Sequence, residues 1–152
     1  TDHIPILELE LSRSDSGIFG LDVGLAINPL GCLGQVEGGI HHGIGYALCE
    51  ELLYEGGQPQ NANFMGYKVL MATDMPEIEV VLVEEPDPDG GPYGAKGVGT
   101  PVMPAIAPAI ANAVRDAIGS RISDLPLTPE KVLKAMQMDR TSGYAGRNWT
   151  SD

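Results

Sequence analysis

The stretch from Glu77 to Gly119 constrains the fold more than any other part of the sequence. It reads EIEVVLVEE, then PDPDGGPYGAKGVGTP, then VMPAIAPAIANAVRDAIG. The first run has the length and the β-branched content of a strand. In the last run apolar residues recur at helical spacing, and Gly119 is well placed to end the helix. The stretch therefore predicts a strand, a glycine-rich loop and a helix.

The loop in this stretch has the composition of a ligand-binding connection. Glycine lets main-chain N–H groups approach a ligand closely, and Lys96 is the one cation placed to meet an anion. The spacing differs from a phosphate-binding loop, which needs a Lys-Ser or Lys-Thr pair after its last glycine, and from the dinucleotide pattern GxGxxG. Spacing alone leaves two alternatives open, a ligand site and a simple tight connection. The glycines are Gly90, Gly91, Gly94, Gly97 and Gly99.

The remaining patterns predict one α+β domain over residues 1–138. Residues 4–11 and 18–23 have strand composition and are joined by a turn, which predicts a hairpin. A helical apolar pattern covers residues 33–52, and Gly56-Gly57 would stop that helix. Residues 58–76 are expected to form a long connection with a short extended piece at 67–71.

The end of the chain predicts one more helix and a tail. Thr128 is a good helix cap and Pro129 suits the first helical position. The buried face of this helix is expected to consist of Val132, Leu133 and Met136. Residues 139–152 are polar and contain glycine, so we expect a loosely held tail.

The first half of the helix predicted at 33–52 is crowded with glycine, each costing about 1 kcal/mol relative to alanine. Two explanations stay open: a flat cofactor presses against this face, or another helix packs closely on it. His41 and His42 follow each other, so their side chains diverge by about 100° and are not expected to share a metal. We expect them in the core or at the edge of a cofactor. The glycines are Gly34, Gly38, Gly39, Gly43 and Gly45.

Composition excludes several classes of protein. Nine basic and 21 acidic residues give a net charge of -12, which would repel nucleic acid and anionic membranes. No apolar run approaches the roughly 18 residues of a membrane helix. Cys32 and Cys49 are too few for a disulfide framework, so we expect buried thiols in a reducing, cytoplasmic setting, with a bridge between them as the alternative.

Several segments, taken in order, resemble the molybdenum-binding large subunit of the xanthine dehydrogenase and aldehyde oxidase family. The wording GPYGAKGVG, followed later by LPLTPEKV, is similar to the last cofactor loop and the closing helix of that subunit. Upstream, the segments DVG…NP, GQVEG and YK…DMP occur in the same order as in the family. The resemblance covers residues 18–136. These segments begin at Asp22, Gly34, Tyr67, Gly91 and Leu125.

The resemblance implies a fold and an assembly. The chain is similar to the C-terminal segment of the large subunit, part of its second molybdenum-cofactor-binding domain. The fold implied is α+β, a mixed sheet packed by two to three helices. The remainder of the large subunit would be a partner, and iron–sulfur clusters and FAD would lie only in partner domains or subunits. The implied reaction oxidises a small aldehyde or N-heterocycle with water as the oxygen source.

The resemblance also implies cofactor contacts. Gln35 is expected to hydrogen-bond molybdopterin, because its amide offers both a donor and an acceptor. Residues expected along the dithiolene side are Gly34, Lys96, Gly97, Val98 and Gly99. For Lys96 an alternative stays open, an ion pair with a neighbouring acid such as Asp87 or Asp89. No protein ligand to the metal is predicted.

Thr100 departs from the family pattern at the catalytic position. The family has a glutamate directly after this loop, and that glutamate is the general base of the hydroxylation. A carboxylate accepts a proton at neutral pH, whereas a threonine hydroxyl is far too weak a base. Three alternatives follow: another carboxylate serves, the chain binds cofactor without hydroxylating, or it is a non-catalytic scaffold subunit with a catalytic partner. The candidate carboxylates are Glu37, Glu84 and Glu85.

Overall fold

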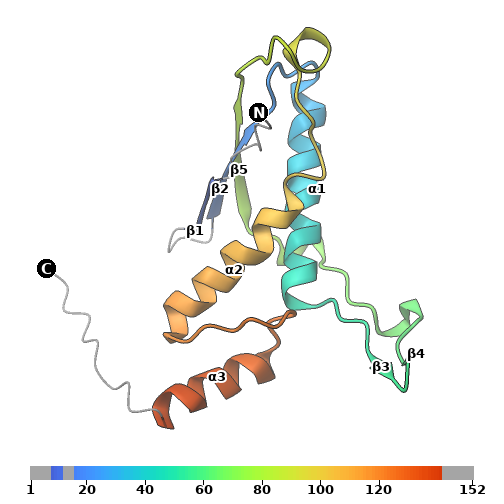
Figure 1. Cartoon of the computed structure of the whole chain (residues 1–152), viewed down its shortest axis with the longest axis vertical. Coiled ribbons are helices and arrows are strands. Elements are labelled where there is room, and N and C mark those ends of the chain that lie inside the picture. Colours follow the sequence, from blue (N-terminus) through green and yellow to red (C-terminus); the bar gives the residue numbers. More distant parts are fainter. Residues whose placement is uncertain (1–7, 12–15, 142–152) are drawn as a thin grey trace, which may run out of the picture.

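The computed structural model describes residues 8–11 and 16–141, with side chains described from 17 to 138. Figure 1 shows an upright helix α1 beside a small sheet, with α2 crossing the lower part of α1 and α3 below it. The start of the predicted first strand, residues 4–7, and the predicted tail from residue 142 onward lie outside the described residues.

A three-stranded mixed sheet forms one side of the fold. The strands are β1 (Glu8–Leu11), β2 (Ser16–Asp22) and β5 (Glu77–Val83), in the order β1-β2-β5. β1 and β2 pair antiparallel, which confirms the predicted hairpin. β2 and β5 pair parallel, from Ser16 opposite Glu77 to Asp22 opposite Val83. Because parallel strands end at the same edge, the segments that follow β2 and β5 leave the sheet side by side.

Two helices pack on the sheet. α1 (Pro29–Leu48) begins four residues before the predicted start, because Asn28 caps it by accepting the Gly31 N–H at 3.0 Å. Its predicted end at residue 52 is wrong, since the last helical residue is Leu48. α2 (Met103–Ile118) ends as predicted at Gly119, which has φ 79° and donates its N–H to the Arg115 carbonyl at 2.7 Å.

The core lies where β2 meets the two helices. α1 supplies Val36 and Ile40, the start of α2 supplies Val102 and Ile106, and β2 supplies its own apolar side chains. The two helices approach too closely for side chains at two helical glycines. The buried members from β2 and the residue after it are Phe19, Leu21 and Val23.

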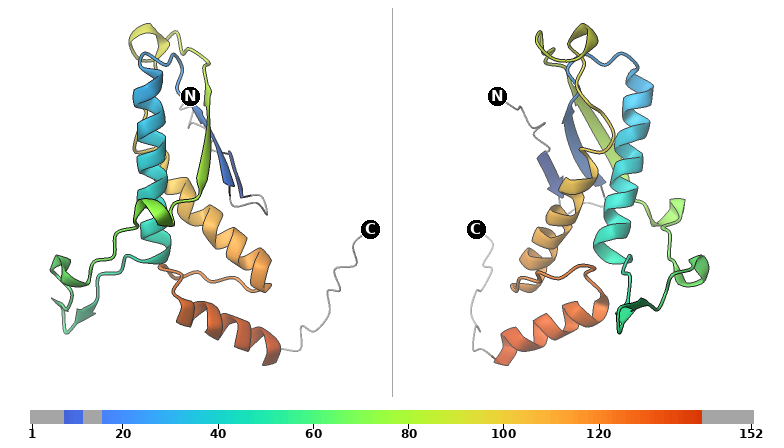
Figure 2. Two further views of the ribbon diagram at one scale, coloured as in Figure 1. Left: turned by 180° about the vertical axis from the view of Figure 1, so that it is seen from behind. Right: turned by 45° about the vertical axis from the view of Figure 1, so that its right-hand side comes forward.

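α3 (Pro129–Thr141) begins where predicted, and the Lys131 N–H reaches the Thr128 Oγ1 at 3.4 Å. Its predicted buried face is wrong in part, because Leu133 is 57% exposed and Met136 is 41% exposed. The reason is that α3 stands apart from the sheet (Figure 2). The connection before it is anchored at Leu127, which is buried and donates its N–H to the Ala47 carbonyl at 2.7 Å.

The segment between α1 and β5 leaves the body of the molecule. It contains β3 (Tyr54–Glu55), β4 (Gln58–Pro59) and the short helices η1 (Phe64–Gly66) and η2 (Ala72–Asp74). Tyr67 and Met71, at the two ends of the piece predicted as extended, do have extended backbone angles, although residues 67–71 form no strand. Both views in Figure 2 show this segment projecting from the lower end of α1.

The structure tests the predicted state of the two cysteines. Both thiols are free: Cys32 is half-buried and Cys49 is exposed. The prediction of buried thiols is therefore wrong for Cys49, which directly follows α1 at the base of the projecting segment, and the two cysteines form no bridge. None of the helices in the described ranges is long and apolar enough to cross a membrane.

Candidate functional site

The glycine loop is held against the turn that follows β2. The Val23 N–H donates to the Val83 carbonyl at 2.9 Å, and the Lys96 N–H donates to the Val23 carbonyl at 2.9 Å. Gly24 has φ 65°, and a Cβ there would overlap the carbonyl oxygen of Gly94 and lie 3.0 Å from the Lys96 nitrogen. The close approach therefore requires glycine at position 24.

An ion pair fixes the same contact. The Lys96 ammonium donates to the Asp22 carboxylate, whose other oxygen accepts the Gly24 N–H at 2.9 Å. The hydrogen bond from Lys96, aided by the Gly24 N–H, holds the pKa of Asp22 below its usual value, against an opposing contribution from burial. The two side chains are only 19% and 21% exposed. Lys96 thus pairs with an acid, as the alternative prediction had it, but the acid is Asp22 and not Asp87 or Asp89.

The first half of α1 and the end of the glycine loop enclose a hollow of about 330 Å³, here called the helix–loop hollow. The structure thus brings the predicted residues Gly34 and Gln35 together with Gly99 and Thr100, although they are more than sixty positions apart in sequence. Gly99 has φ 122°, and a Cβ there would lie 2.9 Å from the Gln35 Oε1. The lining residues are Gly34, Gln35, Gly38, Gly39, His42, Gly99, Thr100 and Met103.

Four of the five glycines singled out in α1 fall into two groups. A Cβ on Gly39 would lie 2.8 Å from the Cβ of Val102, and one on Gly43 would lie 2.6 Å from the Cγ1 of Ile106. These two glycines permit close packing of α2. A Cβ on Gly34 or Gly38 would meet nothing within 4 Å. These two leave the floor of the helix–loop hollow bare.

A second hollow of about 210 Å³ lies on the other side of Gln35. Its lining includes the predicted residues Lys96 and Val98, together with the half-buried Cys32. Gln35 lines both hollows, so its amide stands between them. Gly97 is exposed and lines neither hollow.

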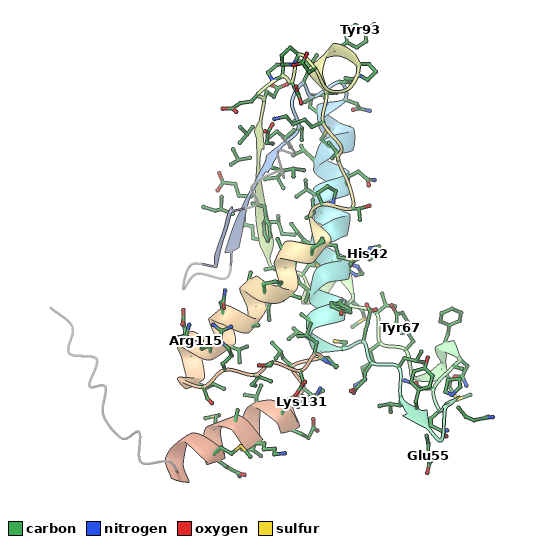
Figure 3. All side chains as sticks on the ribbon, viewed as in Figure 1. His42, Glu55, Tyr67, Tyr93, Arg115 and Lys131 are labelled. Carbon is green, nitrogen blue, oxygen red and sulfur yellow. The ribbon has the colours of Figure 1, made fainter. Side chains whose placement is uncertain are left out.

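His42, which was expected in the core or at the edge of a cofactor but not named among the site residues, lines the helix–loop hollow. It is the only titratable side chain among the described residues of that lining, and Figure 3 shows it projecting from the middle of α1. His41 instead bonds the Leu70 carbonyl through Nε2 at 3.0 Å. The signal that could have found His42 is its spacing: residues 35, 38, 39 and 42 recur at three and four positions, so they share one helix face.

No carboxylate lines the hollow beside Thr100 in the part of the chain that the structure describes. Of the three candidate bases, Glu84 makes a different contact, because its Oε1 accepts the Ala26 N–H at 2.8 Å. Glu37 and Glu85 are exposed and absent from the lining. Within the described ranges, no three His, Cys, Asp or Glu side chains gather into a metal site.

Comparison with known proteins identifies relatives of this chain. Residues 17–76 match the family model of the molybdopterin cofactor-binding domain. Over 119 residues, 77% of this chain, the sequence is 40% identical to a putative xanthine dehydrogenase molybdenum-binding subunit of Escherichia coli. Quinoline 2-oxidoreductase from Pseudomonas putida 86 superposes over 80% of this chain with a TM-score of 0.74 and 32% identity. Aldehyde oxidoreductase from Desulfovibrio gigas superposes over 81% with a TM-score of 0.71 and 38% identity.

The chain is therefore related to the molybdenum-binding subunits of the xanthine dehydrogenase and aldehyde oxidoreductase family, and its residues 17–76 match the cofactor-binding domain of that family. The region of similarity is only a small part of each relative's length. It spans 16% of the Escherichia coli subunit and of the quinoline 2-oxidoreductase chain, and 13% of the aldehyde oxidoreductase chain.

Proposed function

We propose that this chain is the molybdopterin-binding, C-terminal segment of the large subunit of a molybdenum hydroxylase. The observation that carries the proposal is the meeting of the Gln35 amide with the backbone at Gly99, above a helix floor left bare at Gly34 and Gly38. A flat, polar cofactor needs this combination of an amide, accessible main chain and no side chains beneath it. The family match over residues 17–76 supports the same cofactor.

Each residue has a distinct part in this proposal. The Gln35 amide binds the pterin edge, and the main chain at Gly97, Val98 and Gly99 approaches the dithiolene. Lys96 lines the second hollow, but its charge is neutralised by Asp22. Its part is therefore to hold the loop in place. When bound, the molybdenum cofactor supplies the two-electron oxidation of an aldehyde or N-heterocycle, with water as the oxygen source.

Thr100 decides between a catalytic and a non-catalytic version of this function. Its hydroxyl does not accept a proton at neutral pH, and the described lining of the helix–loop hollow holds no carboxylate. These observations favour a second candidate function, a scaffold segment that keeps the fold and the cofactor contacts but does not itself supply the general base.

The proposed partners follow from the small share of the relatives that this chain spans. The remainder of the large subunit completes the cofactor site, and iron–sulfur and FAD domains or subunits carry the electrons away. The complex is expected in the cytoplasm, acting on a small-molecule substrate.

Substitution of Gln35 tests the cofactor contact. In the native complex, Gln35→Ala removes both amide hydrogen bonds, each worth about 1 kcal/mol, so molybdopterin should dissociate about tenfold or more faster. The matched control is Glu37→Ala, on the same helix but outside the hollow. Metal analysis and the fluorescence of the released, oxidised pterin give the stoichiometry. Equal retention in both variants, or no pterin in the unaltered complex, would contradict the proposal.

A further inference from the structure

The projecting segment, residues 52–71 and here called the arm, exposes an unusual number of large apolar side chains. In η1, Phe64 is 90% exposed and Met65 is 94% exposed. Eight of the twenty large apolar residues exposed in the described part of the chain fall within these positions. The others in the arm are Leu52, Leu53, Tyr54, Tyr67, Val69 and Met71.

The arm is also poor in charge. Residues 56–67, GGQPQNANFMGY, contain no charged side chain, although charged residues make up 20% of the whole chain. Solvated surface loops carry charge, whereas the centres of protein interfaces are depleted of it and enriched in Phe, Tyr and Met. The composition of the arm is that of an interface centre.

Local hydrogen bonds hold the arm in shape. The Asn61 side chain accepts the Leu53 N–H at 2.8 Å and donates to the Glu51 carbonyl at 2.7 Å. The Asn63 Oδ1 accepts the Met65 N–H at 3.0 Å. The rings of Phe64 and Tyr67 meet edge to face, with centroids 6.1 Å apart. The exposed apolar side chains are therefore presented on a preorganised backbone, which lowers the entropic cost of binding.

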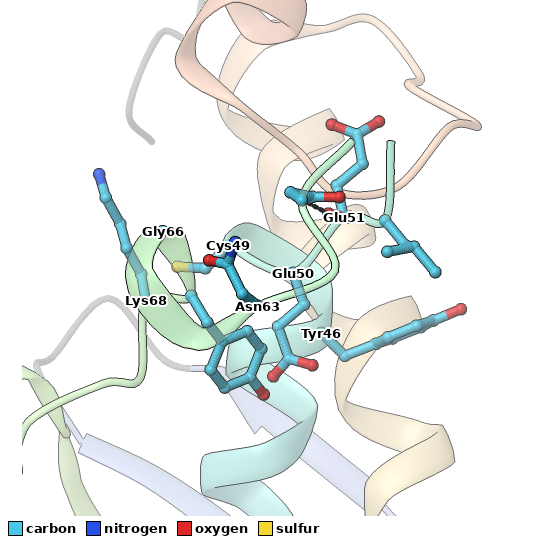
Figure 4. A pocket seen from close by; sticks show the side chains of 10 residues that line it. Tyr46, Cys49, Glu50, Glu51, Asn63, Gly66 and Lys68 are labelled. Carbon is cyan, nitrogen blue, oxygen red and sulfur yellow. Dashed lines mark hydrogen bonds between the residues drawn. The ribbon is translucent and has the colours of Figure 1, made fainter. Parts of the chain in front are cut away.

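A hollow of about 340 Å³ opens at the base of the arm. Figure 4 shows Glu50 there, between Tyr46 of α1 and Asn63 of the arm. Its walls come from Tyr46 of α1 and the residues just after that helix on one side, and from the arm on the other. The arm and this hollow therefore form one continuous surface, with apolar side chains that project and a recess that can receive a side chain of a partner.

We propose that the arm is the docking surface for the remaining part of the molybdenum-binding large subunit. This inference rests on the proposed function. The chain corresponds to only 16% of its Escherichia coli relative, and its described part buries ten hydrophobic residues while exposing twenty large ones. A polypeptide several times larger is thus expected beside it, and the uncharged stretch 56–67 of the arm fits an apolar face of that polypeptide.

Photo-crosslinking in the native complex identifies the occupant. With Phe64 replaced by benzoylphenylalanine, we expect adducts to peptides from the remaining part of the large subunit. Adducts to a second copy of this chain, to a different subunit, or to nothing would overturn the inference. Molybdenum and pterin content of the unaltered complex is measured alongside, because a complex without cofactor refutes the proposed function and leaves the crosslink result intact.

Substitution of exposed side chains measures how much the arm contributes to assembly of the complex. Phe64→Asp with Met65→Asp should lower the yield of assembled native complex at least about tenfold, since burying two charges against an apolar partner is costly. Tyr93→Asp is the control, because Tyr93 is 83% exposed at the tip of another loop. An unchanged yield in the arm variant, or an equal loss in the control, would overturn the inference. Because neither arm residue is buried, secondary structure by circular dichroism should stay unchanged.

Discussion

Substituting Gly43 tests whether close packing of α1 on α2 holds the site together. An added Cβ would overlap the Cβ of Ile106 and lie 2.6 Å from its Cγ1. A Cβ cannot rotate away, so the cost should lie near the upper end of overpacking, about 3 kcal/mol. Alanine returns about 1 kcal/mol of helix propensity. Gly43→Ala should therefore lower the free energy of unfolding by about 2 kcal/mol.

Gly38→Ala is the matched control for this experiment. It makes the same chemical change on the same helix, but a Cβ at Gly38 meets nothing within 4 Å. This variant should gain about 1 kcal/mol from helix propensity, so the two variants should differ by about 3 kcal/mol. Urea unfolding followed by circular dichroism measures both values, with equal m-values as a check on two-state behaviour. A Gly43 variant as stable as the Gly38 variant would refute the packing argument.

Two further predictions concern the loop and its catalytic position. Asp22→Asn should remove an acid-sensitive part of the stability: because Lys96 lowers the pKa of Asp22, that part is fully present above about pH 4 and lost as the pH falls through the lowered value. Urea midpoints between about pH 5 and pH 2 check this, and an identical pH profile in both proteins would contradict it. Thr100→Glu in the complete complex should raise hydroxylase turnover by about 100-fold or more if a positioned base is all that is missing. An unchanged rate, with cofactor content also unchanged, would favour the scaffold function.

Sequence reasoning succeeded where a pattern is local. The hairpin, β5 and the end of α2 at Gly119 follow from composition, spacing and one glycine. The residues of the motifs, through their resemblance to the family, correctly predicted that Gln35 and Gly99 lie close together. A resemblance carries spatial information that spacing does not.

Sequence reasoning failed where a contact with a residue far along the chain determines the structure. Lys96 pairs with Asp22, 74 positions away, because β2 and β5 run parallel and bring the two ends together. Proximity in sequence had instead favoured Asp87 and Asp89. The apolar spacing of α3 likewise predicted a buried face at Leu133, yet the structure places no core there.

The glycines of α1 show the limit most clearly. Composition could not distinguish cofactor contact from helix packing, and the structure shows close helix packing at only two of these glycines. Gly39 and Gly43 face α2, whereas Gly34 and Gly38 face open space. Only the position of α2 around the helix, a tertiary feature, separates the two pairs.

A cryo-EM structure of the cofactor-loaded native complex tests the central claim most directly. We predict density for the pterin within hydrogen-bond distance of the Gln35 amide, with the main chain of residues 97–99 against the dithiolene. Pterin density located away from both α1 and the glycine loop would contradict the account.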